Sequence, residues 1–107
     1  LWLLYHYFLL IDTIYDTIYN VIVAQWEKLL NKIKSLNQGM RFDELKKVLE
    51  EYGYTMTSPS KGSSHYTFRK PGCNPITIPK HEPIKVVYVK LVKSVVEADT
   101  EKQEGSK

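Results

Sequence analysis

The chain has 107 residues, of which 43% are hydrophobic and 25% are charged, so its size and composition are typical of one globular domain and exclude a second independent core. A single cysteine excludes an intrachain disulfide and is typical of a reducing compartment, so we expect a cytoplasmic protein. The net charge of +3 is concentrated in residues 61–93, where seven basic residues against one acid give +6. This segment suits a phosphate-backbone binder, and a solvated basic surface is the simpler alternative.

Residues 1–23 form an apolar N-terminal extension. The unbroken apolar run at its start is too short to span a bilayer, and Asp12, Asp16 and Asn20 then recur on one stripe of a helix. An amphipathic helix that covers a partner or the domain itself is therefore favoured over a transmembrane span. The extension also lacks the basic start and small-residue cleavage site of a secretory signal.

A short helix and a linker are predicted within residues 24–39. Apolar residues recur there at the i, i+3, i+4, i+7 spacing of an amphipathic helix, at Trp26, Leu29, Leu30 and Ile33. The sequence Asn-Gln-Gly at residues 37–39 is expected to end this helix.

Residues 40–98 are predicted to form the folded domain, which begins with the most regular helical stripe in the chain. This stripe consists of Phe42, Leu45, Val48, Leu49 and Tyr52. Asp43 and Glu44 lie near its N-terminus, where acidic residues are favourable, and Gly53 is suited to its C-terminal end.

Three strands and a final helix are expected to follow. Residues 54–57 are β-prone, residues 58–62 form a turn-rich loop, and residues 66–69 and 76–78 alternate on either side of a turn at 71–75. A last helical stripe follows Pro83 and consists of Ile84, Tyr88, Leu91, Val92 and Val95. Residues 99–107 are predicted to be a disordered acidic tail. The fold class is therefore α+β, in the order α-β-β-β-α, with an extra N-terminal helix.

His65 is the main candidate for chemistry, because it follows Gly62 and two serines at the start of a predicted strand in the most basic part of the chain. RNA supplies its own nucleophile, the 2′-hydroxyl, so a minimal ribonuclease needs a general base and cations that stabilise the charge developing on phosphorus. His81, between the last strand and the last helix, is a possible catalytic helper. An ordinary strand histidine and a loop histidine near a helix start are the simpler interpretations of these two residues.

Residues near His65 are candidates for binding RNA phosphates, either through a positive charge or through hydroxyl and amide groups in a loop that a phosphate can approach closely. They are Lys61, Gly62, Ser63, Ser64, Arg69, Lys70 and Lys80. The three histidines and one cysteine do not have the spacing of a zinc site, so neither a metal nor another cofactor is expected. Tyr66 and Phe68 suit base stacking, but their alternation favours a role in the core.

The sequence resembles the HicA family of toxins over roughly residues 41–97. Three segments carry the resemblance: residues 49–54 (Leu-Glu-Glu-Tyr-Gly-Tyr), residues 62–68 (Gly-Ser-Ser-His-Tyr-Thr-Phe) and residues 76–81 (Ile-Thr-Ile-Pro-Lys-His). The family motif is Gly-Ser-His with an aromatic residue three places later, and its histidine corresponds to His65. Here Ser64 is an additional residue between Ser63 and that histidine. A second family element, Pro-x-His, corresponds to residues 79–81.

The resemblance implies a fold like that of a double-stranded-RNA-binding domain. It also implies a toxin of a type II toxin–antitoxin system, with ribosome-independent mRNA interferase activity and a cognate HicB antitoxin that covers the active site. The leading hypothesis is therefore a metal-independent endoribonuclease in which His65 is the general base or acid. One alternative is a non-catalytic RNA-binding module that blocks translation by occupancy, and another is a partner-binding adaptor.

The resemblance also bears on the N-terminus, because relatives of this longer type look as if they begin close to residues 24–27. One hypothesis is that Val23 is a misread start codon and that residues 1–22 are translated upstream sequence. Mass analysis of the natively expressed N-terminus tests it, and peptides from residues 1–20 would contradict it.

Overall fold

The computed structural model describes residues 1–59 and 61–105. Ser60, in the predicted loop, and residues 106–107, in the predicted tail, lie outside the described residues. The chain divides into two compact units, Leu1–Leu30 and Asn31–Lys107. The predicted domain belongs to the second unit, which contains both candidate histidines.

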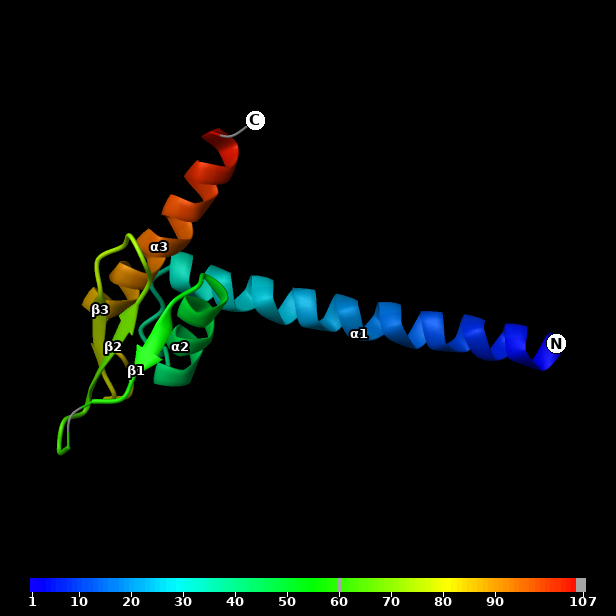
Figure 1. Cartoon of the computed structure of the whole chain (residues 1–107), viewed down its shortest axis with the longest axis horizontal. Helices are drawn as coiled ribbons and strands as arrows, with labels where there is room; N and C mark the ends of the chain where they lie inside the picture. Colours follow the sequence, from blue (N-terminus) through cyan, green and yellow to red (C-terminus); the bar gives the residue numbers. More distant parts are fainter. Residues whose placement is uncertain (60, 106–107) are drawn as a thin grey trace. The chain divides into compact units, whose positions relative to one another are not determined.

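Helix α1 spans Trp2–Lys34 without a break (Figure 1). The sequence suggested an extension and a separate short helix, but no Gly or Pro occurs between residues 2 and 34, so nothing interrupts the backbone hydrogen bonds. Residues 1–22 are all exposed. By length and composition alone α1 meets the criteria for a membrane-spanning helix, with a mean hydropathy of 1.3 in an 18-residue window. Signal sequences and the core helices of soluble proteins meet the same criteria.

Backbone hydrogen bonds around Leu36 end α1, close to the stop predicted at residues 37–39. The N–H of Leu36 donates to the carbonyl of Ile33 and that of Asn37 to the carbonyl of Lys32, both at 3.0 Å. This pair of bonds is a Schellman motif, and it places Leu36 at φ 56°, a conformation usually taken by glycine. Ile33, just before the turn, is fully buried.

Helix α2, Phe42–Glu51, is capped at its N-terminus by two glutamates. Glu44 Oε1 accepts a hydrogen bond from the N–H of Arg41 at 3.0 Å, and Glu82 Oε1 accepts one from the N–H of Phe42 at 3.1 Å. These bonds satisfy backbone donors that the first turn of a helix leaves free. Four residues of the predicted stripe are confirmed as buried in α2, namely Phe42, Leu45, Val48 and Leu49, whereas Tyr52 follows the helix as its C-cap and is only half-buried.

Strands β1 (Thr55–Thr57), β2 (His65–Arg69) and β3 (Ile76–Pro79) form an antiparallel sheet in the order β1-β2-β3. Side chains alternate across it, because successive residues of a strand point to opposite faces. On one face Phe68 is paired with Met56 and Ile76, and Tyr66 with Ile78. The ring of Phe42 lies 5.0 Å from that of Tyr66, so α2 covers this face. The opposite face, called here the open face, carries Thr55, Thr57, His65, Thr67, Arg69 and Thr77.

Helix α3, Val86–Gly105, buries Val89, Val92 and Val96 and contacts α2. The prediction of a disordered tail from residue 99 is wrong for residues 99–105, which continue this helix. Thr100 Oγ1 donates to the carbonyl of Val96 at 3.1 Å, and the Gln103 amide donates to Asp99 at 3.2 Å. These i, i+4 contacts and the absence of Pro favour continuation of the helix.

The second unit thus has the order α2-β1-β2-β3-α3, with two helices and a three-stranded antiparallel sheet. This arrangement confirms the predicted α+β fold, which is like that of a double-stranded-RNA-binding domain with an extra N-terminal helix. His65 lies at the start of the central strand, and His81 lies just after β3.

Candidate functional site

A short loop before β2 positions His65. Gly62 takes φ +88°, and no atom of the described residues lies within 4 Å of the place where a Cβ would stand, so backbone conformation rather than space favours glycine there. Ser63 Oγ then accepts a hydrogen bond from the N–H of His65 at 3.1 Å. The loop therefore fixes the backbone of the candidate catalytic residue.

The side chain of His65 is exposed and belongs to the open face of the sheet. Its residue is paired with Pro79 of β3. In the part of the chain that the structure describes, the imidazole ring has no hydrogen-bond partner. Both ring nitrogens are thus accessible to a ligand, as an acid–base group requires.

His81 lies beside the loop that carries His65. The N–H of Lys80 donates to the carbonyl of Ser64 at 2.8 Å, and Ser64 Oγ is 3.5 Å from His81 Nε2, which is the outer limit for a hydrogen bond. Glu82 and Ile84 anchor the same segment, because the first caps α2 and the second donates its N–H to Met40. Two segments far apart in the sequence therefore meet at Ser64.

The predicted phosphate-binding cations lie in different places. Lys80 Nζ lies 5.6 Å from the ring centroid of Phe42 and 5.9 Å from that of Tyr66, so it belongs to the covered side of the sheet. Arg69 is exposed on the open face, at the opposite end of β2 from His65. Lys61 is exposed in the loop before Gly62. Of these three, Arg69 is the residue whose side chain lies on the same face of the sheet as that of His65.

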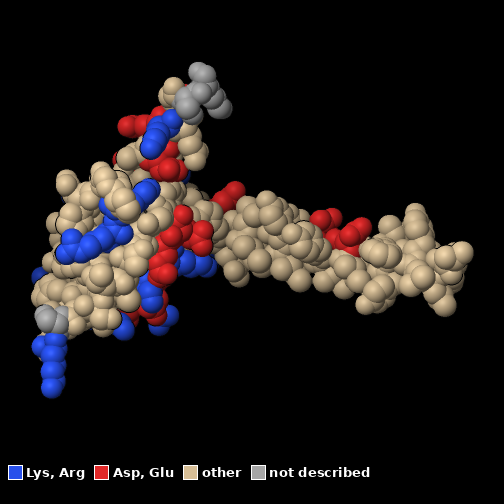
Figure 2. All heavy atoms as spheres, viewed as in Figure 1, with Lys and Arg blue, Asp and Glu red and all other residues tan. Residues whose placement is uncertain are grey.

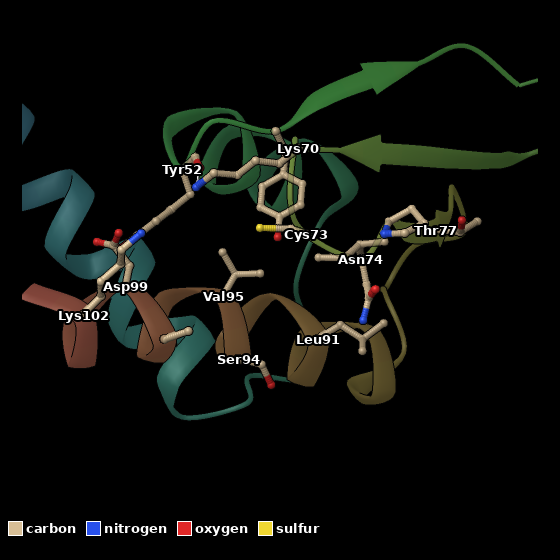
Figure 3. A pocket seen from close by; sticks show the side chains of 14 residues that line it. Tyr52, Lys70, Cys73, Asn74, Thr77, Leu91, Ser94, Val95, Asp99 and Lys102 are labelled. Atoms are coloured by element: carbon tan, nitrogen blue, oxygen red, sulfur yellow. Dashed lines mark hydrogen bonds between the residues drawn. The ribbon is translucent and has the colours of Figure 1, made fainter.

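Lys70 has a structural partner that the sequence did not reveal. Its Nζ donates to the carbonyl oxygen of Tyr52 at 2.8 Å and lies 5.8 Å from the ring centroid of Tyr54. The side chain thus satisfies a carbonyl at the C-terminal end of α2, where cations are favourable. Figure 3 shows Lys70 reaching toward Tyr52, at the end of β2 remote from His65.

A cavity of about 420 Å³ lies at that remote end, between α3 and the turn that joins β2 to β3 (Figure 3). Burial raises the pKa of Tyr54 above its ordinary value of 10.0, and the neighbouring Cys73 adds to the shift. Burial also raises the pKa of Tyr52, with a smaller contribution from Asp99. Neither His65 nor His81 lines this cavity, so it is separate from the histidine site.

On the face that Figure 2 shows, basic charge is less concentrated than it is along the sequence. In Figure 2 the Lys and Arg side chains on the visible face form separate clusters, with acidic side chains between some of them. Among the described residues no group of three or more His, Cys, Asp or Glu side chains is placed to hold a metal ion.

Sequence reasoning missed a row of threonines across the open face. Thr57 is paired with Thr67, and Thr67 with Thr77, so one residue from each strand lies in line. Thr67 Oγ1 and Thr77 Oγ1 are 3.0 Å apart, and Thr57 Oγ1 donates to the carbonyl of Thr67 at 3.0 Å. The sequence does show Thr alternating with apolar residues in all three strands. Only the pairing register shows that one threonine from each strand lies in line with the others.

The fold and this loop define a small α+β domain that presents an exposed histidine on the polar face of its sheet. The family model described as "HicA toxin of bacterial toxin-antitoxin" matches residues 42–98, more than half of the chain, and the chain therefore belongs to the HicA toxin family. The protein is thus a toxin of a toxin–antitoxin system, and the family implies an antitoxin partner. No curated protein and no solved structure matches the chain.

Proposed function

We propose that this toxin is a metal-independent, ribosome-independent mRNA interferase of the cytoplasm, an endoribonuclease in which His65 is the catalytic residue. The observation that carries the proposal is the placement of His65, which is exposed and fixed by Ser63 at the first position of β2. Arg69 lies on the same face, and no residue of the three strands is Asp or Glu. An acid–base group and a cation are therefore accessible to RNA on this face. No carboxylate on the strands repels the RNA phosphates.

The chemistry uses the 2′-hydroxyl of the substrate as nucleophile. His65 accepts the proton of this hydroxyl as its oxygen forms a bond to the adjacent phosphorus, and the bond from phosphorus to the 5′ oxygen breaks. A proton then passes to the departing 5′ oxygen, from water or from His81. Lys61, which is exposed in the loop before Gly62, is the cation proposed to stabilise the charge that develops on the phosphoryl oxygens, whereas Arg69 at the far end of β2 contacts a more distant phosphate. The reaction requires no oxidant, metal or cofactor.

His81 is the helper in this proposal. Its Nε2 lies near Ser64 Oγ, and Lys80 joins its segment to the loop that precedes His65. This connection supports a role in which His81 donates a proton or contacts a phosphate beside the reacting bond. The proposed partner is a HicB-like antitoxin that covers the exposed His65 and so prevents RNA from reaching it.

The test is the His65→Ala variant, measured for RNA cleavage and for growth inhibition. We expect cleavage to fall by roughly 10²–10⁴-fold, as is typical for loss of a general acid–base group, with the unfolding midpoint unchanged because the side chain is exposed. His6→Ala is the matched control, since this exposed histidine lies in the first unit, outside the family match.

Two results would contradict the proposal. If a folded His65→Ala variant cleaves RNA at the rate of the native chain, His65 is not the catalytic residue. If the native chain yields no cleaved products, and the His65→Ala variant still binds RNA and inhibits translation, the protein is an RNA-binding module that acts by occupancy.

A further inference from the structure

The open face of the sheet carries hydroxyl groups in line across all three strands. The threonine row consists of Thr57, Thr67 and Thr77, and adjacent strands lie about 4.8 Å apart, so the row is roughly 10 Å wide. Thr57 and Thr77 are exposed and Thr67 is half-buried. These hydroxyls do not pack against the core, because the core lies on the other face of the sheet.

Hydrogen-bond counting shows what the row offers to a ligand. A threonine hydroxyl has one proton to donate and two lone pairs to accept with. Thr67 and Thr77 share one hydrogen bond, so one of the two hydroxyl protons remains free. Thr57 uses its proton on the carbonyl of Thr67, which leaves its lone pairs open. The row therefore presents both a donor and several acceptors to solvent.

The row lies between the proposed catalytic residue and a cation. His65 precedes Thr67 by two positions on β2, and Arg69 follows it by two, so all three side chains point to the open face. Each step corresponds to roughly 7 Å along the strand. The strands carry no carboxylate, and their aromatic residues, Tyr66 and Phe68, belong to the covered face.

We propose that the open face binds the sugar–phosphate backbone of a single RNA strand and leads it to His65. The inference rests on the proposed function. Arg69 pairs with a phosphate, and the threonine row hydrogen-bonds ribose 2′-hydroxyls and phosphate oxygens, because a 2′-hydroxyl both donates and accepts as the row does. The face has no aromatic side chain on which bases could stack, so it contacts the backbone and tolerates different base sequences.

The size of the face favours one strand over a duplex. A double-stranded-RNA-binding domain that recognises a duplex by shape contacts two successive minor grooves over about 16 base pairs. The distance from His65 to Arg69 along β2 is roughly 13 Å, which suits a few nucleotides of one strand. The sheet face and the histidine on it thus form one continuous surface for a short stretch of single-stranded RNA.

The test replaces Thr67 and Thr77 by valine, singly and together, in the full chain. Valine keeps the β-branched shape and removes the hydroxyl, so the sheet is preserved while the hydrogen bonds are lost. We expect KM for a single-stranded RNA to rise about tenfold in the double variant, with kcat changed little, because the row binds backbone and does not react. Thr100→Val, on α3, is the matched control and should leave KM unchanged.

A second arm measures affinity for RNA and for DNA of the same sequence in the His65→Ala background, where cleavage does not occur. We expect RNA to bind more tightly than DNA, and the two valine substitutions to remove that preference. If the double variant has a changed unfolding midpoint, Thr57→Val, which leaves the Thr67–Thr77 bond intact, should still raise KM several-fold.

The outcomes separate this inference from the proposed function. If the native chain cleaves RNA through His65 but all the valine variants keep the native KM, the inference is wrong and the function stands. If the valine substitutions weaken the binding of duplex RNA as much as the binding of single-stranded RNA, the assignment to one strand is wrong. If the native chain neither binds nor cleaves RNA, the proposed function itself fails.

Discussion

At the scale of single residues, two adjacent serines have different structural roles. Ser63 accepts the hydrogen bond from the His65 N–H, whereas the carbonyl of Ser64 accepts from Lys80 and its hydroxyl lies near His81. Ser64 is the residue that separates this chain from the Gly-Ser-His pattern. It does not displace the histidine from the first position of β2, and it connects the loop to the segment after β3.

Gly62 is the residue whose replacement should distort this loop. At φ +88° an alanine is strained by about 1 kcal/mol even though no described residue obstructs its Cβ, so Gly62→Ala should lower the free energy of unfolding by that amount and reduce cleavage. Gly62→Asn is the matched variant and should lose less, because asparagine tolerates positive φ better. Urea unfolding and a cleavage assay measure both. Equal stability and activity in all three proteins would show that the loop needs no glycine.

At the scale of elements, the start of α2 is the point where three segments of the second unit meet. Glu44 accepts hydrogen bonds from the N–H of Arg41 and from Lys32 Nζ, each at 3.0 Å, and Glu82 accepts one from the N–H of Phe42 at 3.1 Å. The segment after β3 is therefore tied to the helix that covers the sheet. This connection holds His81 near Ser64 and so links the fold to the candidate site.

Stability should depend on pH through Glu44. Burial raises the pKa of this carboxyl, but the hydrogen bonds from Arg41 and Lys32 and their positive charges outweigh burial and hold it below the ordinary value of 4.5. Because the folded-state pKa is the lower one, the stabilisation is complete above about pH 4.5 and is lost as pH falls through the folded-state value.

Glu44→Gln should therefore lower the free energy of unfolding by about 0.5–1 kcal/mol at neutral pH and by much less near pH 3. Urea unfolding at the two pH values measures the difference. Glu51→Gln is the matched control, because Glu51 is exposed on the same helix and has no ion pair among the described residues. A loss of stability that is the same at both pH values would exclude the charge as its cause.

At the scale of the whole molecule, the residues that match the family model all lie within the compact second unit. The match begins at the first residue of α2 and ends within α3, and the second unit begins at Asn31, in the last turn of α1. Ile33 is fully buried and Lys32 pairs with Glu44, so the last turn of α1 contributes to the folded domain. Residues 1–22 are exposed throughout.

Deletion of residues 1–23 should therefore leave the unfolding midpoint and RNA cleavage unchanged. Deletion of residues 1–35 is the matched comparison and should destabilise the domain by about 2–5 kcal/mol, since it removes the buried side chain of Ile33. Thermal unfolding followed by circular dichroism measures both. A marked fall in the midpoint after the shorter deletion would show that the apolar part of α1 supports the domain.

The sequence predicted the order of helices and strands because each element has a regular apolar pattern of its own. It also led to His65 and His81 as candidate site residues, and the alternation in residues 65–69 is enough to place His65 on the side opposite Phe68. It was wrong about residues 99–105, where helix-forming residues continue α3. It also divided α1, because a change in composition does not interrupt helical hydrogen bonds.

Local patterns determined the elements of this protein, but the partners of its candidate site residues depended on the tertiary structure. Lys70 and Lys80 looked equivalent to Arg69 in the sequence, yet Lys70 binds the end of α2 and Lys80 lies over the buried ring of Phe42. The threonine row and the contact between Ser64 and His81 join residues from different strands and loops. Such contacts follow from strand register and helix packing, which bring together residues that no local pattern connects.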